Sequence, residues 1–197
     1  MPPAPNRQRV LRAATASFLE DGYRSSVERI AQRAGVAKQT VYSHFPSKDE
    51  LFKEVARELA KRVLVQLETG SHEVRPALLR FASVYREKVL CPEGIAMFRT
   101  LVSEIPRFKT LARAIFAGGP GETARGLAEF LDNAMSAGRL RKDDPQFAAE
   151  LLLGMLVGHD RIKRVYGVAK FANGGDARHA ARIVDCFLRM YSTERRP

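Results

Sequence analysis

SVERIAQRAGVAKQTVYSHFPSK, residues 26–48, is the stretch that decides the fold, because it predicts two short helices joined by a tight turn. Before the turn, apolar residues recur at the spacing of one helix face: Val27, Ile30, Ala31 and Ala34. Gly35 follows them and can adopt the positive φ that ends a helix sharply. A second helix begins near Ala37 and turns Val41 and Phe45 inward, so its polar side chains face outward. This pattern is typical of a helix-turn-helix.

The outward face of the second helix carries groups that can read double-stranded DNA. Gln39 can pair bidentately with adenine, Lys38 can reach guanine or a phosphate, and the methyl group of Thr40 can contact thymine. Tyr42 lies on the flank of this face, where its phenol can hold a phosphate. His44 can do the same, or it can cap or pack the helix at the border of the inner face.

Two capping-box patterns predict helix starts on either side of the turn, Ser25 with Glu28 and Ser47 with Glu50. Lys48 falls in the first turn after Ser47, where its charge opposes the helix dipole unless an anion lies nearby. We predict that this anion is a DNA phosphate; an exposed lysine with no such role is the alternative. The residues predicted to contact DNA are Ser26, Lys38, Gln39, Thr40, Tyr42, Ser43, His44 and Lys48.

The segment resembles the DNA-binding head of the TetR family of bacterial transcriptional regulators. Matching residues run through the first 51 positions: Gly22, Tyr23, Ile30, Ala31, Ala34, Gly35, Val36, Thr40, Val41, Tyr42, His44, Phe45, Lys48 and Leu51. Ala37 departs from the pattern, since Ser or Thr is common there in the family, and we carry no phosphate contact onto it. The resemblance implies a repressor that binds a palindromic operator as a homodimer and is released by a small ligand.

The charge of the chain favours a polyanionic partner. Its 33 Lys and Arg residues exceed its 22 Asp and Glu residues, which gives a formal net charge of +11 and a pI near 10.1. Phosphates that are neutralised by clustered cations release counterions, so such a surface favours nucleic acid. A basic solvated surface is the alternative, and the helix-turn-helix pattern favours DNA over it. Arg7, near the start of the first predicted helix, is a further candidate for phosphate contact.

Cysteine usage and hydropathy point to a reduced, aqueous compartment. Cys91 and Cys186 lie far apart and form no CxxC pair, so we expect no disulfide, metal site or cofactor. The polar N-terminus, MPPAPNRQR, does not resemble a signal peptide. The longest apolar run, residues 151–158, is far shorter than the roughly 20 residues that span a bilayer. We therefore expect a cytoplasmic protein with no membrane partner.

The hydrophobic pattern predicts an all-α fold. No segment alternates with period two over a useful length, whereas every long segment fits the helical period of 3.6. Gly and Pro residues separate predicted helices over residues 7–21, 47–67, 76–90, 92–105, 108–116, 121–137, 145–165 and 176–191. We predict a three-helix helix-turn-helix head, residues 1–50, on a helical ligand-binding and dimerisation body, residues 51–197.

The last two predicted helices, 145–165 and 176–191, look like half of a four-helix dimer interface. The first is apolar nearly all round, and Gly154 and Gly158, one turn apart, allow a second helix to approach closely. The TetR family dimerises at this place. We therefore predict a homodimer with these interface residues: Leu152, Leu156, Ile183, Phe187 and Tyr191.

Residues 92–160 resemble the subgroup of the TetR family with an AefR-like C-terminal domain, through SEIPRF, AGGPG and the helix that begins DDPQFAAE. The family resemblance implies an inducer pocket between body helices. We predict an apolar or amphipathic ligand, with Met and aromatic side chains around it and His159 as a polar anchor. The candidate pocket residues are Met97, Phe98, Leu101, Phe108, Phe116, Phe130, Met155 and His159; an ordinary helical core is the alternative for each.

Other classes of function find less support in the residues. The chain has no HExxH or GxSxG motif and its histidines are scattered, so we expect no enzyme. The glycines of residues 118–121 lack the Lys-Ser/Thr pair of a phosphate-binding loop, and Pro120 can simply open the next helix. A thiol-redox regulator acting through Cys91 or Cys186 stays open, although apolar surroundings predict buried, inert thiols. A DNA-binding protein that responds to no ligand also stays open.

Overall fold

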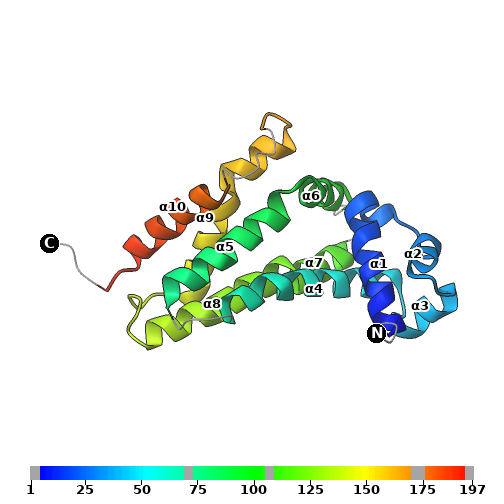
Figure 1. Cartoon of the computed structure of the whole chain (residues 1–197), viewed down its shortest axis with the longest axis horizontal. Coiled ribbons are helices and arrows are strands. Elements are labelled where there is room, and N and C mark those ends of the chain that lie inside the picture. Colours follow the sequence, from blue (N-terminus) through cyan, green and yellow to red (C-terminus); the bar gives the residue numbers. More distant parts are fainter. Residues whose placement is uncertain (1–4, 69–72, 105–108, 170–175, 194–197) are drawn as a thin grey trace. The chain divides into compact units, whose positions relative to one another are not determined.

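The computed structural model of the chain describes residues 5–68, 73–104, 109–169 and 176–193. Within these ranges every regular element is helical, which confirms the predicted all-α fold (Figure 1). The elements are α1 (Asn6–Asp21), the 3-10 turn η1 (Gly22–Arg24), α2 (Val27–Ala34), α3 (Lys38–His44), α4 (Lys48–Glu68), α5 (Val74–Leu90), α6 (Pro92–Glu104), α7 (Lys109–Gly118), α8 (Pro120–Ser136), α9 (Pro145–Val165) and α10 (Asp176–Met190).

Local sequence signals set most helix ends, with small differences in position. Gly22 ends α1 with φ 64°. The N-cap of α2 is Ser26 and not Ser25: the Ser26 hydroxyl accepts a hydrogen bond from the Arg29 N–H at 3.1 Å, whereas Ser25 is buried. The N-cap therefore lies one residue after the predicted one, and Arg29 stands where a capping box has Glu or Gln. Ser47 caps α4 as predicted and accepts from the Glu50 N–H at 3.1 Å.

α5 begins two residues earlier than the proline pattern predicts. Its N-cap is Glu73 and its first residue is Val74, so Pro76 lies inside the first turn. The first turn of a helix tolerates proline, because the N–H groups there have no partner within the helix. Pro76 therefore marks the start of the helix without being its first residue.

Contacts divide the chain into two compact units, each with its own core. Unit 1 comprises Met1–Leu59 and Glu93–Pro120, and unit 2 comprises Ala60–Pro92 and Gly121–Pro197. Residues 93–120, which the sequence assigns to the body, thus share a compact unit with the helix-turn-helix. The functional boundary at residue 50 stays a prediction.

The core of unit 1 forms where α1 packs on α2 and α3 and where α4 and α7 add apolar side chains. The rings of Phe18 and Phe52 lie 4.6 Å apart by their centroids. Ile115 of α7 is buried in the same cluster. Its main members are Val10, Leu11, Ala14, Phe18, Ile30, Val41, Phe45, Leu51, Phe52, Val55 and Ile115.

The core of unit 2 forms around α5, which lies side by side with α9 and α10 (Figure 1). α8 closes this core, and the Gly126 backbone approaches Leu64 so closely that an added Cβ would lie 2.7 Å from its methyl groups. The main buried members are Leu78, Phe81, Leu127, Leu131, Leu152, Leu156, Val184, Phe187 and Tyr191. Burial of each large apolar side chain contributes about 1.5–3 kcal/mol.

α9 is broken at Gly158, where the backbone is non-helical with φ 14° and ψ −119°. Arg86 of α5, only 1% exposed, holds both sides of the break. It donates one hydrogen bond to the Leu156 carbonyl and another to the Asp160 carboxylate, the latter at 2.8 Å. The sequence predicts Gly158 as a point of close helix approach, but an added Cβ would meet no atom within 4 Å there. Within this chain, its role is to break the helix.

Four of the five residues predicted to contact a second copy lie inside unit 2. Leu152, Leu156 and Phe187 are fully buried and Tyr191 is 2% exposed, while Ile183 is half-buried. Apolar periodicity identifies a buried face but does not distinguish burial within the chain from burial against a partner. The four buried residues pack in the core of this chain, and their contact with a second copy stays a prediction.

Candidate nucleic-acid interface

α3 presents a continuous polar face to solvent. Val41 and Phe45 anchor the helix, at 1% and 4% exposure, in the core of unit 1. With these two residues inward, Gln39, Tyr42 and Ser43 are exposed, as the helical phase predicts. The large phenol of Tyr42 is 40% exposed on this face. A short helix with buried anchors and an exposed polar face has the form of a recognition helix.

The turn before α3 has the geometry that the glycine predicts. Gly35 adopts φ 63° and ψ 41°, and its N–H donates to the Gln32 carbonyl at 3.1 Å. The next N–H, of Val36, reaches back to the Ala31 carbonyl at 3.0 Å. Together these bonds form the Schellman arrangement that ends α2. α3 then starts after Ala37, whose side chain makes no capping hydrogen bond.

Lys38 is already paired in the absence of DNA. Its ammonium forms an ion pair with Glu28 of α2 and lies 5.8 Å from the centroid of the Tyr42 ring. The hydrogen bond with Glu28, and then the charge of Glu28, raise the pKa of Lys38. The same hydrogen bond lowers the pKa of Glu28. Lys38 is therefore held beside Glu28, and its remaining N–H donors can reach a base or a phosphate.

The other α3 residues predicted to contact DNA differ in exposure and in the hydrogen bonds they already make. Gln39 is exposed and Thr40 is half-buried. The Ser43 hydroxyl donates to the Thr40 carbonyl at 2.9 Å, so it must rotate to donate to DNA. His44 is exposed at the last residue of the helix, with its ring centroid 6.5 Å from that of Phe45. Among the described residues, His44 makes no capping hydrogen bond, and it stays on the polar face of α3.

Lys48 sits beside an arrangement that the sequence does not reveal. Its ammonium lies 4.3 Å from the ring centroid of Tyr23, a cation–π distance. The Tyr23 hydroxyl donates to the Asp49 carboxylate, and its ring meets Phe52 edge-on at 5.4 Å. Burial lowers the pKa of Lys48 against the opposing charges of Asp49 and Glu28. Burial, followed by the hydrogen bond to Asp49, raises the pKa of Tyr23. Tyr23 thus fixes the start of α4.

Two further candidates have structural roles of their own. Ser26 is exposed, but its hydroxyl caps α2, so a phosphate contact would add to an existing hydrogen bond. Arg7 of α1 forms a 2.9 Å ion pair with Glu54 and stacks its guanidinium 5.2 Å from the Phe45 ring. The hydrogen bond from Arg7 is the largest cause that lowers the pKa of Glu54. Arg7 therefore ties α1 to α4.

Two family models match this chain. Residues 10–55 match the bacterial regulatory proteins of the TetR family, and residues 76–193 match the C-terminal domain of AefR-like transcriptional repressors. The chain belongs to the TetR family. It is a transcriptional repressor of this family, with DNA binding implied by the helix-turn-helix. Since the family is regulatory, the prediction that the chain is not an enzyme is confirmed.

Individual TetR-family relatives align over nearly the whole chain. The HTH-type transcriptional repressor AcnR of Corynebacterium diphtheriae is 27% identical over 183 residues, 91% of this chain and 87% of AcnR. A solved TetR-family regulator from Mesorhizobium loti superposes with a TM-score of 0.77 at 28% identity, over 95% of this chain and 97% of that one. The flavonoid-responsive regulator FrrA superposes with a TM-score of 0.68 at 31% identity, over 96% and 98% of the two chains.

The residues predicted to line a TetR-family ligand pocket are distributed over both units. Met97 and Leu101 of α6 pack against the core of unit 1. Phe116 is 64% exposed on α7, and Phe130 and Met155 pack against the core of unit 2. The remaining three are Phe98, half-buried on α6; His159, exposed next to the break in α9; and Phe108, which lies outside the described residues.

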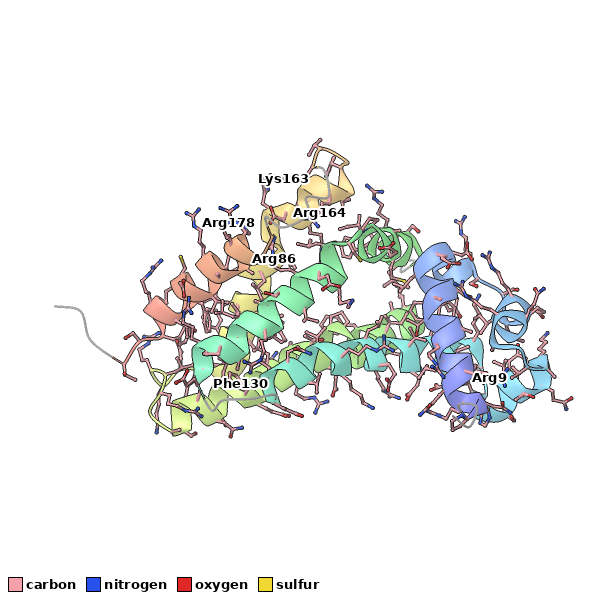
Figure 2. The ribbon with its side chains drawn as sticks, viewed as in Figure 1. Arg9, Arg86, Phe130, Lys163, Arg164 and Arg178 are labelled. Atoms are coloured by element: carbon pink, nitrogen blue, oxygen red, sulfur yellow. The ribbon has the colours of Figure 1, made fainter. Side chains whose placement is uncertain are left out.

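One depression of about 660 Å³ lies within unit 2, between α4 and α8 (Figure 2, Phe130). Of the eight predicted pocket residues, only Phe130 lines it. Both apolar and charged side chains line it: Lys61, Leu64, Val65, Leu67, Glu68, Glu122, Arg125, Gly126, Glu129, Phe130, Asn133 and Arg139. The described cavity thus differs from the predicted pocket, whose place stays a prediction.

The cysteines differ from the expectation of buried thiols. Cys91 is half-buried, and its thiol donates to the Lys88 carbonyl at 3.4 Å. Cys186 is exposed on α10, and its sulfur accepts a hydrogen bond from the Arg189 guanidinium at 2.9 Å. The expectation of burial is therefore wrong for Cys186.

The described ranges hold neither a metal cluster nor a membrane-spanning helix. In those ranges, no three His, Cys, Asp or Glu side chains come together as a metal site. Across the same ranges, no helix has both the length and the apolar character that a bilayer crossing needs.

Proposed function

We propose that two copies of this TetR-family chain bind an inverted-repeat operator, each with α3 in a major groove, and leave it when a small apolar or amphipathic ligand binds. The polar face of α3 carries this proposal: Gln39, Tyr42 and Ser43 face solvent on a helix whose Val41 and Phe45 are buried. Such a helix can enter a groove without disturbing its buried anchors, and its exposed side chains can reach base edges and phosphates.

A homodimer would give the pair of recognition helices that a palindrome requires. Two-fold symmetry places identical helices on successive half-sites when they stand about 34–36 Å apart. Support for a second copy comes from apolar side chains that stay exposed on α9, on α10 and just after α9: Phe147, Ile162, Tyr166, Val168 and Met190. Large apolar side chains that stay exposed on these elements are compatible with a protein partner.

Release by a ligand needs a connection between the body and the recognition helix. Ile115 of α7 is buried in the same cluster as Phe52 and Val55 of α4, close to the anchors of α3. A ligand that binds one arrangement of α6 and α7 better than another would shift the packing of this cluster. Because FrrA is named as flavonoid-responsive, planar aromatic compounds of that class are the first ligands to test on this chain.

The experiment starts with selection of bound fragments from the source genome, followed by binding to the selected duplex and to random DNA. Gln39→Ala should weaken operator binding by about 1–3 kcal/mol and relax base preference at one position. Gln32→Ala, an exposed glutamine on α2, is the matched control and should change neither. Equal losses of operator and random DNA for Gln39→Ala would remove its assigned role.

A second candidate function is a response to oxidants through Cys186. The supporting observation is that this thiol is exposed and lies 2.9 Å from the Arg189 guanidinium. Peroxide can oxidise an accessible cysteine to a sulfenic acid. Operator affinity should then fall under peroxide and return under reductant in the wild type but not in Cys186→Ser. An unchanged affinity under peroxide would contradict the oxidant response, and the ligand response would then be the one that remains.

A further inference from the structure

We propose that Arg9 of α1 is the positioning residue for the recognition helix: its guanidinium clamps the turn between α2 and α3 by holding the carbonyl groups at the end of α2. This inference rests on the proposed function for its DNA readout, but the clamp itself is a property of the DNA-free protein. Arg9 has not been assigned a contact with DNA, and the geometry gives it a different role.

The clamp is a pair of hydrogen bonds across a gap of 25 residues in sequence. Arg9 Nη2 donates to the Ala34 carbonyl at 2.7 Å and to the Gly35 carbonyl at 3.0 Å. A third bond, from Nη1 to Asn6 at 3.3 Å, orients the guanidinium from within α1. Figure 2 shows Arg9 on the part of α1 that lies beside α2 and α3.

Counting the carbonyls at the end of α2 shows why the clamp matters. The last carbonyls of a helix have no partner within it. The Schellman bonds satisfy those of Ala31 and Gln32. Arg9 satisfies those of Ala34 and Gly35, which lie in the turn itself. The guanidinium also brings a positive charge to the negative end of the helix dipole.

On the other side of the turn, α3 is tied to α2 by the exposed ion pair of Lys38 with Glu28 but has no side-chain cap. Ala37 occupies the N-cap of α3 and has no side-chain oxygen, so no side chain caps the first N–H groups of α3. With only seven residues, α3 has little helical stability of its own. The path of the chain into α3 therefore depends on the restraint from α1.

The close fit at Gly35 shows how tightly the guanidinium is placed. A Cβ added at Gly35 would lie 2.8 Å from Arg9 Nη2, so the arginine occupies the space of a side chain. Because Nη2 is engaged by two carbonyls, it does not compete for phosphates. Loss of Arg9 should accordingly change base discrimination and leave the salt dependence of binding unchanged.

The test uses full-length Arg9→Gln and Arg9→Lys, with Arg12→Gln, an exposed arginine of the same helix, as the charge-matched control. The first readout is amide hydrogen exchange of residues 34–40 in the DNA-free protein. Arg9→Gln should speed this exchange by about tenfold, the effect of one lost charge-assisted hydrogen bond. Arg9→Lys should keep most of the protection, since a single nitrogen makes both contacts. Arg12→Gln should leave it unchanged.

The second readout compares affinity for the operator and for random DNA. Arg9→Gln should lower the ratio of these affinities by about tenfold with an unchanged salt slope. Adding Ala37→Ser to Arg9→Gln should restore protection of the first amides of α3, because serine supplies the missing N-cap. If Arg9→Gln exchanged faster but the wild-type protein selected no operator, the clamp would be supported while the proposed function would be refuted. Unchanged exchange and unchanged specificity in Arg9→Gln would overturn the inference.

Discussion

Replacement of Asp160 by Asn tests how the break in α9 is held. The Asp160 carboxylate accepts a 2.8 Å hydrogen bond from Arg86, whose side chain is 2% exposed while that of Asp160 is 28% exposed. His179 lies on the other side, with its Nε2 3.5 Å from the same carboxylate oxygen. Asp160→Asn keeps a hydrogen-bond acceptor but removes the negative charge of this carboxylate from beside the buried guanidinium.

The expected cost follows from the burial of the two partners. Removal of one member of a fully buried ion pair costs about 3–5 kcal/mol, whereas an exposed pair contributes about 0–1 kcal/mol. Because Asp160 is partly exposed and Asn can still accept a hydrogen bond, we expect a loss of about 2–3 kcal/mol in the free energy of unfolding. Arg86→Met should cost a similar amount, since it also strips the Leu156 carbonyl of its donor.

The pH dependence has a definite sign. Burial would raise the pKa of Asp160, but the hydrogen bond and charge of Arg86, aided by His179 and Lys163, hold it below its ordinary value of 3.8. A carboxylate with a depressed pKa stabilises the fold above its unfolded pKa, and this contribution is lost as the pH falls through the folded pKa. The wild type should therefore lose stability below pH 4 more steeply than Asp160→Asn.

Urea unfolding at fixed protein concentration, from pH 7 down to pH 3, measures both effects. Asp185→Asn is the control, because its partner Arg75 and Asp185 are 53% and 38% exposed in the same unit. This exposed pair should contribute less than the pair of Arg86 and Asp160. The reasoning about Arg86 would be refuted if Asp160→Asn lowered the free energy of unfolding no more than Asp185→Asn does. It would also be refuted if Asp160→Asn lost stability below pH 4 as steeply as the wild type.

Three further changes concern unit 1. Gly35→Ala should lower stability by about 1–2 kcal/mol and weaken operator binding, because alanine is strained at φ 63° and its Cβ would meet the Arg9 guanidinium; unfolding and binding curves measure both. Tyr23→Phe should cost about 1–2 kcal/mol in thermal unfolding, through loss of the hydrogen bond to Asp49, and a change near zero would deny that bond a stabilising role. Lys48→Ala should weaken all duplexes equally and reduce the salt slope by about one, and a base-specific loss would contradict phosphate contact.

Local signals in the sequence predicted the frame of the site well. The helical phase around Val41 and the positive φ of Gly35 depend on a few adjacent residues, so the exposed face of α3 followed from spacing alone. The same holds for the cap at Ser47, whose partner is three residues away. Helix starts near proline shifted by one or two positions, because a first turn accepts proline at more than one place.

Contacts between distant segments were beyond the reach of pattern reading. Arg9 and Arg86 look like ordinary surface arginines in sequence, and their carbonyl partners lie 25 and 70 residues away. Leu152 and Phe187 were correctly expected to be buried, but the pattern could not tell a core face from a partner face. The candidate pocket residues were selected for their mostly apolar and aromatic side chains, and residue type alone does not place side chains in one cavity.

The most direct test of the account is the stoichiometry of binding to an inverted repeat at moderate ionic strength. Analytical ultracentrifugation with labelled duplexes would compare the intact selected repeat, a single half-site and a version with one half-site scrambled. The account predicts two protomers on the intact repeat and much weaker binding to the other two duplexes. One protomer per duplex, or equal affinity for all three, would contradict the pairing of recognition helices on which the proposed function depends.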